Sequence, residues 1–375
     1  MELDVAVVGG GPVGLIAARE AARRGLRTTV FEEDLVIGRP ERCAGLYSID
    51  GVRSLGLPVD GPYVQNKVKG AVFVSPSGKS FVVDSGRKIA LVCNRERLDQ
   101  FIAEQAVDAG AELCVGERVV EAKLADDHVW IKSSSIEARA KHLISAEGRP
   151  AYTAKQIIQD YKLEPWLPII QYQIANHRQS PDMVYLYFRE YLNEFFGYLV
   201  PVDEKVGKFG VAASKNTNFL ASKLLAELFP NAKLLGVSSS SIYLGKPLRK
   251  PRIGPLMLVG DVAGQTKATT GGGVITGGLA AVAAAKHAAG EGEYENLVKP
   301  LLKELYRTYL LRRLVRAVRP KTLDALFQAI TESKFYIELG KVGDMDKHGS
   351  TAFKAVRSRA AFRLAAYFVK NLLGV

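Results

Sequence analysis

The sequence predicts an α/β protein in which a parallel β-layer is interwoven with a mainly antiparallel β domain and is followed by C-terminal helices. Three features of the chain predict this fold. The N-terminus reads as a buried strand, a glycine-rich turn, a helix and a second strand. The centre, residues 151–245, reads as short antiparallel strands with one helix. From Glu295 onward, apolar residues recur at helical spacing.

Composition narrows the class of protein. The chain has 375 residues, of which 47% are apolar and 24% charged, as in ordinary globular proteins. Its three cysteines are too few for a disulfide framework and show no CxxC spacing, so we expect a cytoplasmic protein without a metal site. A strand begins at once, which argues against a signal peptide. No run of about 18 uncharged apolar residues predicts a membrane span.

The positive charge is concentrated at one end of the chain. The net charge is +12, and residues 299–375 contain 16 Lys and Arg against 6 Asp and Glu. Such a concentration suits a phosphate-bearing partner, either an anionic substrate or peripheral contact with the inner face of a membrane. It is equally typical of a solvated helix surface. No fold motif for nucleic acid binding accompanies it, so we expect no nucleic acid partner.

The first thirty residues predict a dinucleotide site. Gly9, Gly11 and Gly14 form a GxGxxG turn, in which glycine lets the backbone turn tightly and approach a pyrophosphate at a helix N-terminus. Glu32 follows the second strand, where a carboxylate accepts the ribose hydroxyl protons. The expected elements are a strand at 3–8, a helix at 12–24 and a strand at 27–31. The glycines and the carboxylate at this spacing together predict the site.

The far end of the chain favours FAD over NAD as the cofactor. There an apolar strand ends in Gly260 and Asp261, and a polar loop leads to a glycine-rich helix start. In FAD enzymes of this architecture such an Asp holds the ribityl and phosphate region, and the helix N-terminus favours the negative charge of reduced flavin. Arg95, in the first turn of a helix that starts at Asn94, is a further candidate contact. No second GxGxxG exists, so we expect an external electron donor, either NAD(P)H or a ferredoxin-like protein.

These motifs together resemble the flavoproteins built like para-hydroxybenzoate hydroxylase. Within that group the chain resembles the geranylgeranyl reductase family, which includes the archaeal enzymes that saturate the isoprenoid chains of membrane ether lipids. The chain resembles the family's PxxxCxGxxS-like segment at Pro40, Cys43, Gly45 and Ser48, with one residue fewer between the proline and the cysteine. Its YxWxFP pattern is matched by FGYLVP at 196–201 in the placing of the aromatic residues and the proline.

The chain departs from the family at several positions. Phe196, Tyr198 and Val200 replace the Tyr, Trp and Phe of the YxWxFP pattern. Ala268 stands where proline usually precedes the second glycine-rich turn, and Glu147 replaces the commoner Asp of a strand-closing Asp-Gly pair. The resemblance covers about residues 1–290.

The resemblance implies sets of contact residues. FAD would be held by the two glycine-rich turns, the carboxylates near the ribose, Arg95 and the loop at residues 39–48, which carries Cys43 and which we call the cysteine loop. These residues are Gly9, Gly11, Gly14, Glu32, Glu33, Arg42, Cys43, Ala44, Arg95, Asp261, Gly271, Gly272, Gly273 and Val274. An isoprenoid offers no polar group, so its channel would be apolar and aromatic. The substrate-binding residues would be Gly45, Tyr185, Tyr187, Phe196, Tyr198 and Pro201, with Phe188 nearby.

Cys43 is the catalytic candidate. In the resembling family its loop passes beside the reactive face of the flavin, where a thiol would donate a proton, shape the pocket or form a redox-sensitive bond. Arg39 and Arg42 flank it and would lower the pKa of the thiol if they lie close in space. The alternative interpretation is a small buried apolar side chain in a loop.

We expect three regions. A Rossmann-like FAD-binding domain would use residues 1–57, 88–150 and 246–295. The substrate-binding domain would use 58–87, with a hairpin at 66–84, and 151–245, with a helix at 218–229. The C-terminal helical region would be 296–375, with helices at 296–319, 327–339 and 353–373. Those helices would either cover the substrate channel or lie on a membrane as basic amphipathic segments.

On this interpretation the protein is an FAD-dependent oxidoreductase acting on CH–CH groups, which saturates geranylgeranyl double bonds of archaeal-type lipids or their precursors. The rival functions are an FAD-dependent monooxygenase or halogenase of an aromatic or quinone-like substrate, and an electron-transferring flavoprotein. Two features distinguish them: whether 196–201 lines an apolar channel or only packs a core, and whether oxygen is consumed. Aromatic residues are also typical of ordinary strand cores.

Overall fold

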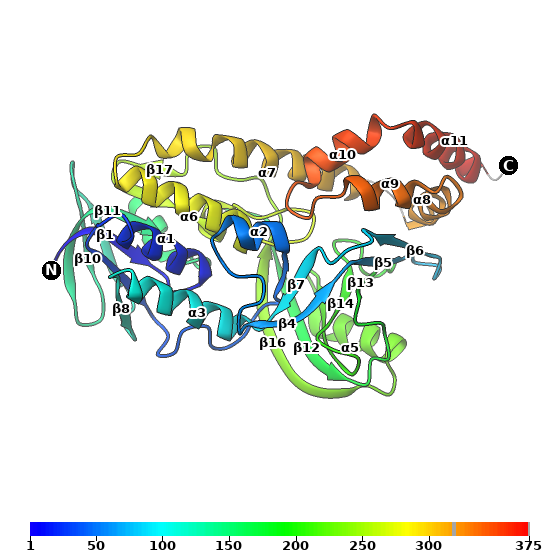
Figure 1. Cartoon of the computed structure of the whole chain (residues 1–375), viewed down its shortest axis with the longest axis horizontal. Coiled ribbons are helices and arrows are strands. Elements are labelled where there is room, and N and C mark those ends of the chain that lie inside the picture. Colours follow the sequence, from blue (N-terminus) through cyan, green and yellow to red (C-terminus); the bar gives the residue numbers. More distant parts are fainter. Residues whose placement is uncertain (317–319, 374–375) are drawn as a thin grey trace.

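The structure is a computed structural model that describes residues 1–316 and 320–373. Three β-sheets form its frame, and Figure 1 shows the two large sheets at opposite ends of the molecule with a row of helices along one edge. Within the described residues, no helix is long and apolar enough to cross a membrane. The predicted α/β architecture is confirmed.

The eight-stranded sheet has a parallel centre. β1 (Glu2–Val8) pairs in parallel with β2 (Thr28–Glu32) and β11 (Glu137–Ser145). The other strands are β8 (Glu112–Val115), β9 (Glu121–Leu124), β10 (Val129–Lys132), β17 (Arg252–Ile253) and β18 (Leu256–Leu258). Val5, Ala6 and Val7 are successive and fully buried, as expected for a strand covered on both faces. The carboxyl ends of β1, β2 and β11 therefore meet at one edge, where a dinucleotide binds.

Three helices pack together beside this sheet: α1 (Pro12–Ala22), α3 (Arg95–Asp108) and α6 (Val274–Ala288). α6 is rich in glycine and alanine, and these small residues allow α6 and α1 to approach each other closely. A Cβ on Gly277 would lie 2.8 Å from Val13 of α1, and a Cβ on Gly278 would lie 2.8 Å from Leu55. The shorter helices are α2 (Ile49–Ser54), α4 (Tyr152–Ile157) and the 3-10 helix η1 (Gly260–Ala263).

The seven-stranded sheet is antiparallel except where β13 pairs with β5. In spatial order its strands are β16 (Lys233–Tyr243), β12 (Trp166–Ala175), β15 (Val206–Ala212), β14 (Gly197–Pro201), β13 (Met183–Tyr187), β5 (Gly70–Val74) and β6 (Ser80–Asp84). The helix α5 (Thr217–Leu228) packs on one face against β12 and β15. The other face turns toward the cysteine loop.

A small third sheet joins the two large ones. β7 (Ala90–Cys93) pairs with β3 (Leu46–Ser48) on one side and with β4 (Val64–Val68) on the other. Residues Ala90 to Cys93 are completely buried. The segment that carries Cys43 therefore enters this sheet directly.

The described residues of the C-terminal region form five helices where three were predicted. They are α7 (Tyr294–Arg316), α8 (Pro320–Glu332), α9 (Phe335–Val342), α10 (His348–Val356) and α11 (Arg359–Leu373). The single helices predicted at 327–339 and 353–373 are wrong. Lys334 adopts a left-handed φ of 56° between α8 and α9, and the Ser358 hydroxyl donates to the Ala355 carbonyl at the α10–α11 break. The predicted helix at 296–319 extends over residues 317–319, which lie outside the described residues.

Aromatic side chains attach this region to the seven-stranded sheet. Phe327 of α8 packs against Phe81 and Phe188, with ring centroids 5.0 and 5.6 Å apart. Arg312 of α7 is buried and donates to the Glu194 carbonyl over 2.7 Å. The C-terminal helices thus cover the outer part of the sheet.

Candidate active site

The glycine-rich turn after β1 has the shape that a pyrophosphate requires. Gly9 has a φ of 103°, and a Cβ there would lie 2.7 Å from the Ala146 carbonyl oxygen. A Cβ on Gly14 would overlap the Gly9 carbonyl oxygen, so glycine is needed for α1 to approach the turn. A Cβ on Gly11 would meet nothing within 4 Å. Open space therefore adjoins the turn at the N-terminus of α1, which fits a bound diphosphate.

The carboxylate of Glu32 lies in this turn. It accepts hydrogen bonds from the Gly10 backbone N–H and, over 2.8 Å, from the Asp34 N–H. Burial raises the pKa of Glu32, and the two backbone donors oppose that shift. Glu33 lies elsewhere: it is exposed and forms a 3.5 Å ion pair with Arg118. The structure therefore brings Glu32, and not Glu33, together with the glycine turn.

The second glycine-rich segment meets the first at η1. Asp261 is half-buried, and burial raises the pKa of its carboxyl to about 6, against the opposing charge of Arg95. A Cβ on Gly273 would lie 2.7 Å from the Asp261 Oδ1 atom, so glycine leaves room for the carboxylate. Gly271 has a φ of 72°, and a Cβ there would lie 2.9 Å from Ile242 of β16. Gly272 lies between them, and Val274 begins α6.

These residues fit FAD. Glu32 suits the ribose, the turn at Gly11 leaves space for the diphosphate, and Asp261 accepts from a hydroxyl. The N-terminus of α6 points its free N–H groups toward the same region. When bound, FAD supplies hydride-transfer chemistry at this end of the site.

Arg95 lies between the second glycine-rich segment and the cysteine loop. Asp99 holds it through two hydrogen bonds, from Nε over 3.0 Å and from Nη2 over 2.9 Å. Its positive charge lowers the pKa of Asp261 and of Tyr47, although burial dominates both groups. Arg95 thus acts on Asp261 and on Tyr47, and its charge suits an anionic cofactor, while its contact with FAD stays a prediction.

Cys43 lies in a tightly constrained loop. Its Sγ accepts from the Gly45 N–H over 3.4 Å and is 3.6 Å from the Tyr47 hydroxyl oxygen. Gly45 has a φ of 72°, and a Cβ there would overlap the Cys93 carbonyl oxygen. Glycine is required at this position because β3 pairs with β7 and brings the Cys93 carbonyl against it. The Cys43 carbonyl accepts from Gln171 Nε2 over 3.3 Å.

A buried ion pair, which the sequence did not predict, holds this loop. Lys208 of β15 has only 3% of its side chain exposed, and its ammonium donates to Glu41 over 2.6 Å and to the Cys93 carbonyl over 3.0 Å. The Glu41 carboxylate also accepts from the Arg95 backbone N–H over 2.9 Å. Three elements far apart in sequence therefore converge on Glu41.

An apolar group of residues adjoins the cysteine loop, and we call it the Tyr198 cluster. Its members are Ala44, Leu46, Val184, Phe196, Tyr198 and Met345. The Tyr198 hydroxyl donates to Gln171 Oε1 over 2.9 Å, so its polar atom is satisfied and its ring remains apolar. Ala44, Leu46, Phe196 and Met345 are only partly buried. Apolar surface therefore remains available beside Cys43, and Pro201 closes β14 at its far end.

Tyr185 and Tyr187 do not belong to this cluster. The register of β13 and β14 pairs Tyr198 with Leu186, which places the two tyrosines on the opposite face of the sheet. There they pack with residues that face α5, including Phe229. The prediction that they share one wall with Phe196 and Tyr198 is therefore corrected. Their alternation along the strand is visible in the sequence, but the face that turns to the flavin is not.

The loop between α9 and α10 also reaches the site, which the sequence did not predict. Asp346 accepts from Lys267 Nζ over 2.8 Å and from the Ser48 hydroxyl. The Lys267 ammonium also donates to the Met345 carbonyl over 2.7 Å. His348 is 2.6 Å from the Thr269 hydroxyl oxygen. The cysteine loop, the second glycine-rich segment and the C-terminal region thus meet at Asp346.

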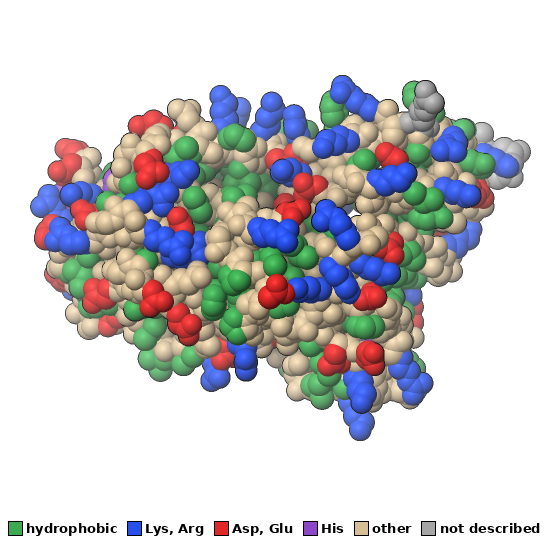
Figure 2. Space-filling view, viewed as in Figure 1, with side chains coloured by type: hydrophobic (Ala, Val, Ile, Leu, Met, Phe, Trp, Pro, Cys, Tyr) green, Lys and Arg blue, Asp and Glu red, His purple; other side chains and the backbone are tan. Residues whose placement is uncertain are grey.

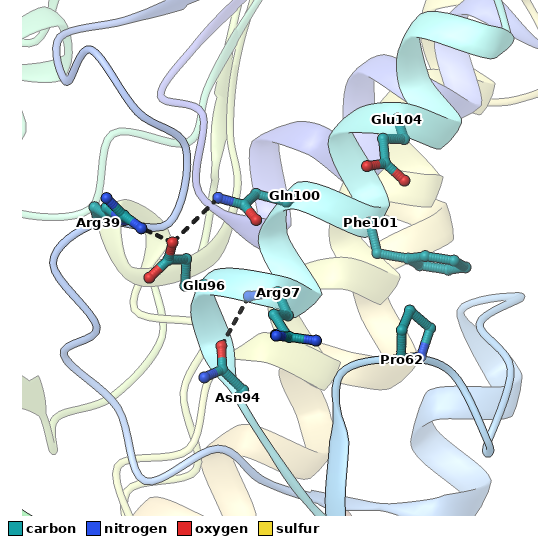
Figure 3. Close-up of a pocket in the computed structure, with 8 residues that line it drawn as sticks. All are labelled: Arg39, Pro62, Asn94, Glu96, Arg97, Gln100, Phe101 and Glu104. Carbon is teal, nitrogen blue, oxygen red and sulfur yellow. Dashed lines mark hydrogen bonds and ion pairs between the residues drawn. The ribbon is translucent and has the colours of Figure 1, made fainter.

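Two open clefts border the cysteine loop. The first, of about 530 Å³, lies along the start of α3 and is lined by Arg39, Pro62, Asn94, Glu96, Arg97, Gln100, Phe101 and Glu104 (Figure 3). Arg39 donates to Glu96 over 2.6 Å there. The second, of about 490 Å³, is lined by Arg42, Arg149, Pro150, Pro168 and Ser239 to Ser241. Arg39 and Arg42 therefore line different clefts, and the structure does not gather both at the Cys43 thiol.

The hydrogen bonds of Glu147 explain why this position holds Glu in place of the commoner Asp. Its carboxylate accepts from the Ser145 hydroxyl over 2.9 Å and from the backbone N–H groups of Thr153 and Ala154 over 3.1 and 3.2 Å. It therefore satisfies free donors at the start of α4. The longer side chain provides the reach for this contact.

Comparisons with known proteins agree with the geometry. Residues 4–151 match the family model described as FAD dependent oxidoreductase. A digeranylgeranylglycerophospholipid reductase of Thermoplasma volcanium is 28% identical over 88% of this chain and 91% of its own length. The resemblance to the geranylgeranyl reductases is thereby confirmed, as is FAD as the cofactor of an oxidoreductase.

Solved structures share the fold. A geranylgeranyl bacteriochlorophyll reductase-like protein from Thermoplasma acidophilum has a TM-score of 0.83 at 21% identity, covering 98% of this chain and 99% of that one. The p-nitrophenol 4-monooxygenase of Pseudomonas putida has a TM-score of 0.69 at 17% identity, covering 96% of this chain and 99% of that one. The fold thus serves both reductive and oxidative flavoproteins.

Two glycine substitutions separate folding from cofactor binding. Gly14→Ala should lower the free energy of unfolding by about 2 kcal/mol, because the new methyl group overlaps the Gly9 carbonyl. Gly11→Ala should change it by no more than about 1 kcal/mol, since open space surrounds that position. The Gly11→Ala substitution should nevertheless weaken FAD binding at least ~10-fold, because the added methyl group keeps the diphosphate away from the backbone of the turn. Denaturant titration and flavin fluorescence measure the two effects, and normal FAD affinity in Gly11→Ala would place the diphosphate elsewhere.

The ion pair that holds the cysteine loop should respond asymmetrically to substitution. Glu41→Ala should lower the free energy of unfolding by about 3 kcal/mol, because it leaves the buried Lys208 ammonium with one carbonyl. Lys208→Met should cost only about 1 kcal/mol, since Glu41 is partly exposed and keeps the Arg95 N–H. Urea unfolding of both variants and of the double variant measures the coupling. A larger loss in Lys208→Met than in Glu41→Ala contradicts this assignment.

Proposed function

We propose that this protein is an FAD-dependent reductase that saturates isoprenoid double bonds in geranylgeranyl lipids or their precursors. The single observation that carries the proposal is the placing of the Cys43 loop beside the Tyr198 cluster, where Gln171 bonds both the Cys43 carbonyl and the Tyr198 hydroxyl. The similarity to digeranylgeranylglycerophospholipid reductases along most of the chain supports it. A site with a thiol on an apolar wall suits a substrate that has carbon–carbon double bonds and no polar group in its chain.

The Tyr198 cluster suits an isoprenoid because the polar atoms of the cluster are already hydrogen-bonded within the protein. Tyr198 donates to Gln171, and Gln171 donates to the Cys43 carbonyl. Each polar side chain of this relay has a partner within the protein, and an apolar chain loses no hydrogen bonds by entering. The partly exposed surface of Leu46, Phe196 and Met345 gains from burial against it.

Saturation of a double bond needs a hydride on one carbon and a proton on the other. The two new C–H bonds replace the π bond, so the second carbon must face a proton donor. We place that proton on the Cys43 Sγ atom. The Tyr47 hydroxyl lies 3.6 Å from the sulfur and orients it, and burial keeps the pKa of Tyr47 well above its ordinary value. Water restores the proton to the thiolate after each reduction.

The electron donor and the place of action are further parts of the proposal. The chain carries one dinucleotide turn, so reducing equivalents come from outside, from NAD(P)H or a ferredoxin-like protein. The basic C-terminal region favours work at the inner face of a membrane, where the lipid substrate resides. Stopped-flow reduction of the bound flavin by each donor identifies which one the protein uses.

The oxidative rivals have less support. A monooxygenase shares the fold at a lower TM-score than the reductase-like protein does. An aromatic or quinone-like substrate carries polar groups that need partners in the site, whereas the polar groups of the Tyr198 cluster are paired among themselves. Oxygen consumption coupled to an aromatic substrate would favour these rivals.

The purified protein should reduce digeranylgeranylglycerol phosphate without oxygen. We expect anaerobic incubation with FAD and dithionite to add two hydrogens per double bond, in steps that mass spectrometry resolves. The control omits the protein, and a second control uses the Gly11→Ala variant, which lacks the cofactor contact. An unchanged lipid mass, with flavin bound and reduced, contradicts the proposed function.

Cys43→Ala should lower the rate of lipid reduction by about 100-fold, because general acids contribute at least that factor. FAD content and flavin reduction by dithionite should stay normal, since the thiol makes no contact that the cofactor turn needs. Cys114→Ala is the matched control, because Cys114 lies on β8 in the outer part of the nucleotide-binding sheet. Reduction at the normal rate in Cys43→Ala assigns the proton to another group.

A further inference from the structure

The last segment of the chain has no acidic residue. Asp346 is the final carboxylate, and residues 347–375 contain six basic residues, Lys347, Lys354, Arg357, Arg359, Arg363 and Lys370. Opposite charges are usually interspersed on the surface of a soluble domain. A segment of this length with one sign of charge therefore points to an anionic partner.

The helix α11 exposes an apolar stripe as well as charge. Phe362 is 78% exposed and Val369 is 54% exposed, and the exposed Ala365 and Ala366 lie between them at helical spacing. The opposite side of the helix, including Leu364, packs against α8 and α9. The helix is thus fixed by one apolar side and presents a second one to solvent.

The preceding helix continues the same pattern. Phe353 is 57% exposed and Val356 is 70% exposed, one turn apart on α10. Lys354 and Arg357 are exposed beside them, and the Arg357 guanidinium lies 3.9 Å from the Phe353 ring centroid. Figure 1 places α10 and α11 in succession at the C-terminal end of the helix row, away from the nucleotide-binding sheet. Figure 2 shows Lys and Arg side chains along the same edge.

We propose that the exposed surface of α10 and α11 docks on an anionic lipid bilayer. We define this docking surface by its apolar residues Phe353, Val356, Phe362 and Val369 and its basic residues Lys354, Arg357, Arg363 and Lys370. The basic side chains complement lipid phosphates, and the apolar ones enter the boundary between headgroups and acyl chains. Interleaving of basic and apolar side chains along an amphipathic helix is typical of segments that lie on a bilayer, and we commit to that partner over an acidic protein.

The position of this surface connects it to the site. The loop directly before α10 contributes Met345 to the Tyr198 cluster and Asp346 to the contact with Lys267 and Ser48. A bilayer on α10 therefore lies one short loop from the apolar wall beside Cys43. The inference rests on the proposed function and deepens it by naming the surface that meets the membrane, and it concerns binding that occurs without turnover.

Vesicle cosedimentation tests the proposal with the full chain carrying FAD. We expect binding to vesicles of equal phosphatidylglycerol and phosphatidylcholine, and binding at least ~10-fold weaker to phosphatidylcholine alone. Added salt should weaken it, because surface charges are screened. No binding to the anionic vesicles overturns the proposal.

Two variants assign the binding to this surface. Phe362→Ser with Val369→Ser should weaken anionic-vesicle binding at least ~10-fold, and Arg363→Glu with Lys370→Glu should do the same. Phe219→Ser is the matched control, because Phe219 is 67% exposed on α5 and should not contribute. Circular dichroism confirms folding of each variant, and reduction of detergent-dispersed lipid reports the active site separately. Unchanged vesicle binding in both double variants overturns the proposal.

Discussion

The site depends on the loop from Arg39 to Ser48 being held against both large sheets, and the Glu41–Lys208 ion pair holds it. Lys208 comes from the seven-stranded sheet, and Glu41 precedes Cys43 by two residues. A buried ammonium cannot be left without partners at low cost, so assembly of the sheets fixes the loop as well. Glu41 then carries the constraint to α3 through the Arg95 N–H. The position of the thiol is therefore a consequence of how the two sheets are joined.

The cofactor end of the site could be predicted because its chemistry is local. The glycines at 9, 11 and 14 and the carboxylate of Glu32 lie in one strand–turn–helix–strand unit, whose spacing alone dictates their meeting. Asp261 and Gly273 likewise belong to one short segment of the chain, and a Cβ on Gly273 would lie 2.7 Å from the Asp261 Oδ1 atom. The sequence contains everything that brings such residues together. The general fold follows from the same local patterns.

The rest of the site could not be predicted because it depends on register and long-range contacts. Tyr185 and Tyr198 are both strand aromatics, and only the pairing of β13 with β14 shows that they point to opposite faces. Glu41 and Lys208 are 167 residues apart, and Ser48 and Asp346 are 298 residues apart. Neither pair has a characteristic spacing in the sequence, and no motif links the two members of either pair. The breaks at Lys334 and Ser358 also escaped prediction, because helical periodicity continues across both.

The hydrogen bonding inside the site explains why it suits an isoprenoid rather than a polar substrate. Tyr198, Gln171 and the Cys43 carbonyl form a closed relay, and Ser48, Lys267 and Asp346 form another. The polar side chains of both relays have partners within the protein, so the surface that the Tyr198 cluster leaves for a ligand is apolar. A substrate with hydroxyl or carbonyl groups would lose its bonds to water there without compensation. An alkene chain has none to lose, and the Cys43 thiol beside it is the proton source that we propose.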